Sequence, residues 1–275
     1  MSAHSHHWPL VTFTSLAIAG AGTVAADSLL TVAGGPRETA LSGLGAALML
    51  AGLMTSLLHL GRPARLLQAV RRVGGSPLSN EVVLASLALA AAIASCMAGI
   101  GYLWVPFAVW LSGGSAALFL VSIGLVYGTG GQLTWRGASV LTPLSGGLAC
   151  GVGVVEGLGQ TAGVSAVSML VLLADAAIFM LRWRRVTSLA VAGHEGEHPW
   201  FDRRHELLLT RFLLLDAIPF VLLSASPSLL VPLVAMAGLV ADRVGFYTLG
   251  VQHTTERELA AVEQAIERTA PPRQM

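Results

Sequence analysis

Long apolar runs, each bounded by charges, prolines or glycine clusters, constrain this chain more than any other feature. The hydrocarbon core of a bilayer is about 30 Å thick, so a helix needs about 20 mostly apolar residues to cross it. The runs are apolar on all sides and do not alternate as the strands of a membrane barrel would. They cover roughly residues 9–32, 39–60, 81–104, 105–127, 139–160, 162–181, 207–226 and 229–250.

The composition supports the same class of protein. Only 11% of the 275 residues are charged, whereas a soluble domain has about a quarter. We therefore predict an all-α integral membrane protein, a bundle of eight transmembrane helices with both termini on the same face. Residues 1–250 would form the membrane domain and residues 251–275 a short amphipathic tail. The formal net charge of +1 gives no field that would recruit nucleic acid.

The basic residues are all arginines, and they are distributed unevenly. With an even number of spans, thirteen of the sixteen fall on the face that carries the termini. They are Arg62, Arg65, Arg71, Arg72, Arg136, Arg182, Arg184, Arg185, Arg203, Arg204, Arg257, Arg268 and Arg273. The positive-inside rule then places both termini in the cytoplasm, although a face that docks an acidic partner would show the same bias. The longest connections, 61–80 and 182–206, lie on this face, so we expect a partner to bind there.

Ionisable residues at membrane depth are costly and indicate function by default. His59 is the single histidine that belongs to a predicted span. A b-type haem held by two histidines from facing helices needs at least two in the bundle. We therefore predict a haem-free protein. Cys96 and Cys150 lie in apolar runs and form neither a CxxC site nor a disulfide framework, and we predict no metal site in this chain.

His59 ends the second span and Glu81 opens the third, so the hairpin brings both to the same face and depth. Imidazole titrates near neutrality, and beside a carboxylate it could accept and relay the proton that a quinol hydroxyl loses on oxidation. Arg62 and Arg65 follow directly and can turn back towards the head groups. The turn-forming residues 75–80 predict a tight loop that ends in a helix N-terminus at Glu81. The alternative is a histidine that only hydrogen-bonds to a neighbouring helix.

Other polar groups inside the spans are secondary candidates. Asp242 and Arg243 are adjacent in the last span, and we expect a structural ion pair that lowers the cost of burying both. Four further acids could mark a proton path across the bundle, or could make isolated polar contacts between helices. These four are Asp27, Glu156, Asp175 and Asp216. The Gly-x-x-x-Gly strings favour close helix packing over a cofactor loop.

The hairpin contains the strings LHLGRPAR at 58–65, RVG at 72–74 and LSNE at 78–81. The chain starts with HWPLVTFT at 7–14, has LTP at 141–143, and ends its last span with Arg243 followed by FY at 246–247. In this order the strings closely resemble the DMSO reductase membrane anchor subunit family, and the block from His59 to Glu81 is the specific part of the match.

The resemblance implies a haem-free eight-helix anchor in a bacterial or archaeal cytoplasmic membrane. Such an anchor has no catalytic activity alone; it holds an iron–sulfur subunit with four ferredoxin-like clusters and, through it, a molybdopterin catalytic subunit. Electrons pass between menaquinol or ubiquinol and the nearest cluster. The family's quinol-site histidine and glutamate fall on His59 and Glu81, and Arg65 matches a basic position.

Two departures leave alternatives open. The acid at Asp242 resembles the sulfite dehydrogenase anchors, in which electrons would flow to the quinone, and the polar insertion at 193–206 differs from the short enteric connection. A purely structural tether is the second alternative. A transporter or proton channel is the third, but the internal repeats expected of many transporter folds are not found.

Overall fold

The computed structural model describes residues 8–35, 38–60, 74–99, 105–128, 134, 137–159, 165–191, 202–225 and 228–249. Within these residues every regular element is helical. The elements are α1 (Trp8–Val32), α2 (Thr39–Leu60), α4 (Pro77–Gly99), α5 (Val105–Gly128), η3 (Gly137–Leu141), α6 (Thr142–Leu158), α7 (Ala166–Val191), α8 (Arg204–Phe212), η5 (Leu213–Ala217), α9 (Ile218–Ala225) and α10 (Leu230–Thr248). The all-α prediction is confirmed for this part of the chain.

Seven helical segments in the described ranges are long and apolar enough to cross a membrane, with α8, η5 and α9 forming one continuous segment. Helix α6 has 17 residues and is shorter than these. The 3₁₀ turn η3 leads directly into it. Together η3 and α6 rise by about 35 Å, because a 3₁₀ residue adds about 2 Å and an α-helical residue about 1.5 Å.

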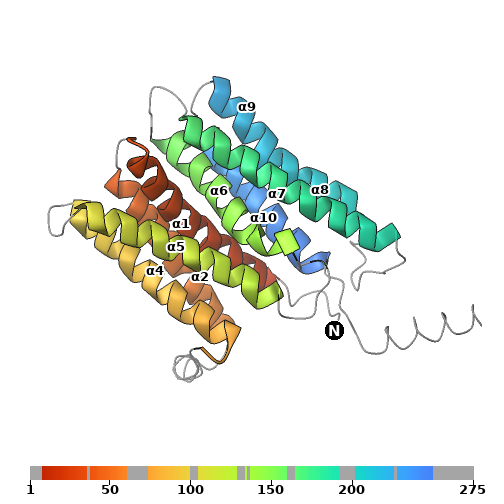
Figure 1. The fold of residues 1–275 in the computed structure, drawn as a ribbon, viewed down its shortest axis with the longest axis horizontal. Helices are drawn as coiled ribbons and strands as arrows, with labels where there is room; N and C mark the ends of the chain where they lie inside the picture. Colours follow the sequence, from red (N-terminus) through yellow and green to blue (C-terminus); the bar gives the residue numbers. More distant parts are fainter. Residues whose placement is uncertain are drawn as a thin grey trace, which may run out of the picture.

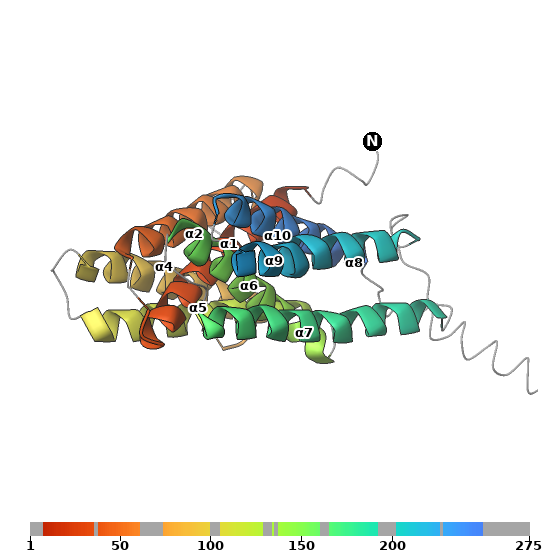
Figure 2. The same ribbon diagram turned by 90° about the horizontal axis from the view of Figure 1, so that it is seen from above.

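Successive helices run in opposite directions along one common axis, with α8, η5 and α9 counted as one helix (Figures 1 and 2). Helices α1, α2, α4 and α5 pack as one group, and α6, α7, α8 to α9 and α10 pack as a second. Helices α1 and α6 contact each other and join the two groups. We call the end where α2 stops and α4 starts the His59 end, and the end where α6 stops and α7 starts the Glu156 end.

Small residues let α1 pack closely against its neighbours. A Cβ atom on Gly22 of α1 would overlap the carbonyl oxygen of Gly147 in α6, and Gly151 approaches the Gly22 backbone in the same way. On the α2 side, a Cβ atom on Gly45 would lie 2.8 Å from the carbonyl oxygen of Gly20. The glycine strings therefore serve helix packing, as predicted.

The outer surface of the bundle is apolar, which suits contact with lipid. Large hydrophobic side chains are exposed on helices from both groups. Among them are Met54, Phe107, Trp110, Leu118, Leu170, Leu173, Val221 and Leu233. A soluble monomer rarely exposes contiguous apolar patches of this kind, so the surface agrees with the membrane class that the long apolar runs predict.

We expect Gly22→Leu to separate α1 from α6 and to destabilise the bundle by several kcal/mol. The added side chain would overlap backbone atoms of α6, which cannot rotate away as the end of a flexible side chain can. Gly114→Ala is the matched control, since a Cβ atom there would meet nothing within 4 Å. Thermal unfolding of the purified protein in detergent measures both variants. Equal unfolding midpoints for the two variants would contradict the close approach.

Three predicted boundaries are wrong. Helix α7 begins at Ala166, four residues after the predicted start at 162. Helix α4 begins at Pro77, four residues before the predicted start at Glu81. Helix α7 continues to Val191, ten residues beyond the predicted end at 181, so Arg182 lies inside the bundle and not in a connection at the terminus-bearing face. The predicted C-terminal tail, 251–275, lies outside the described residues.

Candidate functional site

Glu81 is a buried carboxylate near the His59 end. Its exposed fraction is 7%, and it lies on α4, which packs against α2. His59 is the penultimate residue of α2, so the two positions are on neighbouring helices at the same end, as the hairpin predicts. The side chain of His59 and both Arg62 and Arg65 lie outside the described residues. Their grouping into one site stays a prediction.

The turn before α4 fixes where Glu81 stands on that helix. Gly74 has a φ of 82°, in the left-handed region that glycine adopts without a steric penalty. Its N–H donates to the side-chain oxygen of Asn80 at 2.8 Å, and the Asn80 N–H donates to the Ser76 carbonyl at 3.1 Å. Pro77 begins the helix, where proline is favoured because its missing N–H costs nothing. Glu81 therefore lies in the second turn, and its prediction at the helix N-terminus is wrong.

Asp242 binds three arginines and not one. Its Oδ1 atom accepts from Arg182 Nη1 at 2.8 Å and from Arg211 Nε at 3.4 Å, while Arg243 donates to Oδ2 from Nε at 3.0 Å and also from Nη2. The predicted ion pair of Asp242 and Arg243 is confirmed, and two further arginines bind the same carboxylate. The pair belongs to a network that joins α7, α8 and α10.

Arg211 connects this network to two more carboxylates. Its Nη2 atom donates to Asp175 Oδ2 at 2.6 Å, and its Nη1 atom donates to Asp216 Oδ2. We call the whole set the ion cluster. It consists of Asp175, Arg182, Arg211, Asp216, Asp242 and Arg243, and the side chains in its ion pairs are at most 5% exposed. Three formal positive charges face three negative charges, which lowers the cost of burying them.

Aromatic rings cover two of the buried guanidinium groups. The Arg211 guanidinium carbon lies 4.2 Å from the centroid of the Phe179 ring, and that of Arg243 lies 4.6 Å from the Phe246 ring. A cation over a ring face is attracted by the ring quadrupole, more strongly where water is excluded. The rings therefore add to the stabilisation that the carboxylates give these two arginines.

A π-helical segment, η5, places Asp216 beside Arg211. The Ile218 N–H donates to the carbonyl of Leu213, five residues earlier, which defines the π turn. In a regular α-helix residues five apart point about 140° away from each other, whereas the wider turn brings Asp216 back over Arg211. Pro219 has no N–H to continue the α-helical pattern across this segment. Such bulges occur frequently at functional sites.

Two cluster members were not singled out as site candidates from the sequence, Arg182 and Arg211. A charge directly after an apolar run normally marks the end of a span, so the sequence predicts a loop at Arg182. A usable signal exists in α7, where Ser168, Asp175 and Arg182 recur every seven residues and are all buried. Residues seven apart lie on one face of a helix, so these three form a polar stripe.

The remaining buried acids make other contacts. Asp27 accepts a hydrogen bond from Ser42 at 2.7 Å, and Glu156 accepts from the hydroxyl of Ser168 and from the Ser165 N–H at 3.3 Å. Of the four acids proposed for a proton path, the structure thus brings together Asp175 and Asp216. In the described ranges no three His, Cys, Asp or Glu side chains are grouped as metal ligands.

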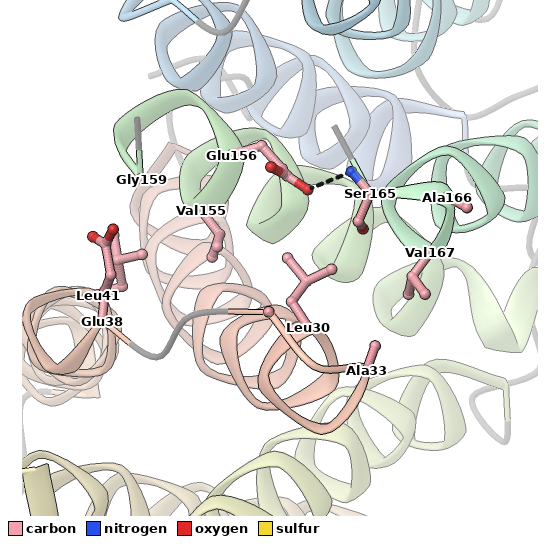
Figure 3. A pocket seen from close by; sticks show the side chains of 11 residues that line it. Leu30, Ala33, Glu38, Leu41, Val155, Glu156, Gly159, Ser165, Ala166 and Val167 are labelled. Carbon is pink, nitrogen blue, oxygen red and sulfur yellow. Dashed lines mark hydrogen bonds between the residues drawn. The ribbon is translucent and has the colours of Figure 1, made fainter. Parts of the chain in front are cut away.

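A cavity of about 330 Å³ opens at the Glu156 end (Figure 3). It lies between the ends of α1 and α6 and the starts of α2 and α7. Its lining is mostly apolar, with Leu30, Leu41 and Val155, and it includes the carboxylates of Glu38 and Glu156. The cavity is therefore at the far end of the bundle from Glu81.

The DMSO reductase anchor subunit (DmsC) family matches residues 1–249 of the protein. The sequence is 27% identical to YnfH, an anaerobic dimethyl sulfoxide reductase chain of Escherichia coli, over 210 residues, which cover 67% of this protein and 71% of that one. It is 35% identical to the C polypeptide of the anaerobic dimethyl sulfoxide reductase of Escherichia coli over 109 residues, 38% of this protein and 36% of that one. With the match running through every described helix, the chain belongs to the DMSO reductase anchor subunit family.

Proposed function

We propose that this chain is the membrane anchor of a molybdopterin oxidoreductase and that it exchanges electrons between the quinone pool and an iron–sulfur subunit. Family membership over residues 1–249 and the long apolar helices support the anchor role. The observation that carries the quinol site is the buried carboxylate of Glu81, on a helix packed against the one that ends beside His59. A buried carboxylate near a membrane face is costly and needs a function.

The same proposal includes the membrane topology. Helix α6 with η3 is the eighth span, and both termini lie on the cytoplasmic face with the arginine-rich connections. Arg182 belongs to the ion cluster and no longer counts among the arginines of that face. The other twelve arginines predicted there still outnumber those predicted on the opposite face. The iron–sulfur subunit docks at the His59 end, which brings its nearest cluster close to the quinol ring.

At the proposed site each residue has a separate task. A quinol that becomes a quinone releases two protons and two electrons. His59 accepts the first proton from a ring hydroxyl and Glu81 relays it away, after which His59 accepts the second proton in the same way. Arg62 or Arg65 binds the ring oxygen or contacts the iron–sulfur subunit. The electrons pass to that subunit. In an anchor that reduces quinone, as in the sulfite dehydrogenase alternative, the same residues would deliver protons to the ring.

Deleting the anchor tests its role in cells. We expect the catalytic and iron–sulfur subunits to move from the membrane fraction to the soluble fraction, while their turnover with an artificial electron donor continues, because the anchor contributes no substrate chemistry. Immunoblots of the two fractions measure the change, and expression of the anchor from a plasmid is the control. Partner subunits that stay fully membrane-bound after deletion would contradict the anchor role.

A further inference from the structure

The ion cluster is neutral as a whole but its charge is uneven along the bundle. Asp175 and Asp216 share one guanidinium, that of Arg211. Asp242 is shared by Arg182, Arg243 and, at 3.4 Å, Arg211. If Arg211 is counted with Asp175 and Asp216, that part of the cluster carries one excess negative charge. Asp242 with Arg182 and Arg243 then carries one excess positive charge. Unbalanced negative charge in a low-dielectric interior attracts a proton.

The geometry shows where such a proton fits. The Oδ1 atoms of Asp175 and Asp216 are buried and have no hydrogen-bond partner among the described residues. The Oδ2 atoms of both carboxyl groups accept from the single guanidinium of Arg211, which places the two groups on the same cation. A proton on either Oδ1 atom would reduce the negative charge that this one cation must balance. Two carboxylates that share one site commonly hold a single proton between them.

We propose that Asp175 and Asp216 form a buried proton-binding pair that exchanges its proton with the cavity at the Glu156 end. The pair is separate from the proposed quinol site and does not depend on it. The proton is held between the two carboxyl groups beside Arg211, and no other bond forms or breaks.

The direction of exchange follows from the residues on either side of the pair. Ser168 lies seven residues before Asp175 on the same buried face of α7, about 10 Å along the helix. Its hydroxyl donates to Glu156, which lines the cavity (Figure 3). Towards the His59 end lies the side of the cluster with excess positive charge, around Asp242. That charge repels a proton, so the Glu156 end is the favoured entrance.

Infrared spectroscopy of the full-length protein in lipid nanodiscs tests whether the pair holds a proton. We expect a carboxylic acid C=O absorption near neutral pH that shifts in D₂O and is lost in both Asp175→Asn and Asp216→Asn. Asp27→Asn is the matched control, because Asp27 is also buried but accepts from Ser42 outside the ion cluster. An absorption that neither substitution at the pair removes would overturn the proposal.

The rate of exchange into D₂O tests the route. Glu156→Gln and Ser168→Val remove the groups between the cavity and the pair, and we expect each to slow exchange at least about tenfold, the effect of losing one hydrogen-bonded step worth about 1.4 kcal/mol. Asp27→Asn should exchange at the wild-type rate. Both route variants leave the ion cluster intact, so they still test the exchange route if the Asp175 and Asp216 variants unfold. Equal rates in all variants would overturn the route.

Discussion

Replacing His59 by alanine is expected to lower quinol-dependent turnover of the assembled complex at least about 100-fold, the usual contribution of a positioned general base. Turnover with an artificial donor, which delivers electrons to the iron–sulfur subunit without a quinol, should stay at the wild-type level. The reason is that the proposed function gives His59, at the end of α2 beside the helix of Glu81, the quinol proton and leaves the substrate chemistry to the catalytic subunit. The measurement is the ratio of the two activities in purified membranes.

The protein offers a histidine control on the same face. His205 is an exposed residue of α8 near the His59 end. The centroid of its ring lies 6.3 Å from the centroid of the Trp183 ring. His205→Ala should leave both activities unchanged, and Glu81→Gln should lower the quinol-dependent activity alone. If His59→Ala has normal quinol kinetics in a complex that stays on the membrane, the protein is a structural tether and the assignment of the quinol site fails.

Arg211→Met is expected to destabilise the protein more than any other single change in the ion cluster. Methionine fills similar space, but the substitution leaves Asp175 and Asp216 buried without their guanidinium. Removing one partner of a buried ion pair costs about 3–5 kcal/mol. For a protein of this size that corresponds to a fall in unfolding midpoint of about 10 °C. Thermal unfolding in detergent, followed by circular dichroism, measures it.

Two further variants separate the lost ion pairs from lost packing. Arg184→Met removes an exposed arginine two residues beyond Arg182 on α7, and it should have little effect. Adding Asp216→Asn to Arg211→Met removes one of the stranded charges and should recover part of the midpoint. A double variant that is no more stable than Arg211→Met would show that stranded charge is not the cause.

The helices could be predicted from the sequence because their ends are marked locally. Helix α1 was expected at 9–32 and observed at Trp8–Val32, and α2 was expected and observed at 39–60. Glycines follow these two apolar runs, at Gly34 and Gly61, and the bilayer thickness fixes the length. The close packing of α1 against α6 through glycines was likewise predictable in kind, although the sequence does not show which glycines meet.

The ion cluster could not be predicted because its partners come from helices far apart in the sequence. Arg182 follows an apolar run directly, and the rule that a charge ends a span placed it outside the membrane. Its carboxylate partner, Asp242, lies 60 residues further on. Arg211 and Asp216 point apart in a regular α-helix, and only the π segment η5 brings them together. For the candidate quinol site, the sequence predicts which helices carry His59 and Glu81 and that both residues are at the same end of the bundle. Glu81 is buried, as a proton relay would need.

Rapid mixing of the purified complex with menaquinol or ubiquinol tests electron exchange through the anchor most directly. The absorbance of the iron–sulfur subunit follows its reduction. We expect quinol to reduce the clusters within a turnover in the wild-type complex and to leave them oxidised in the complex with His59→Ala, although dithionite reduces both. Equal reduction by quinol in a complex that lacks the anchor would contradict the proposed function.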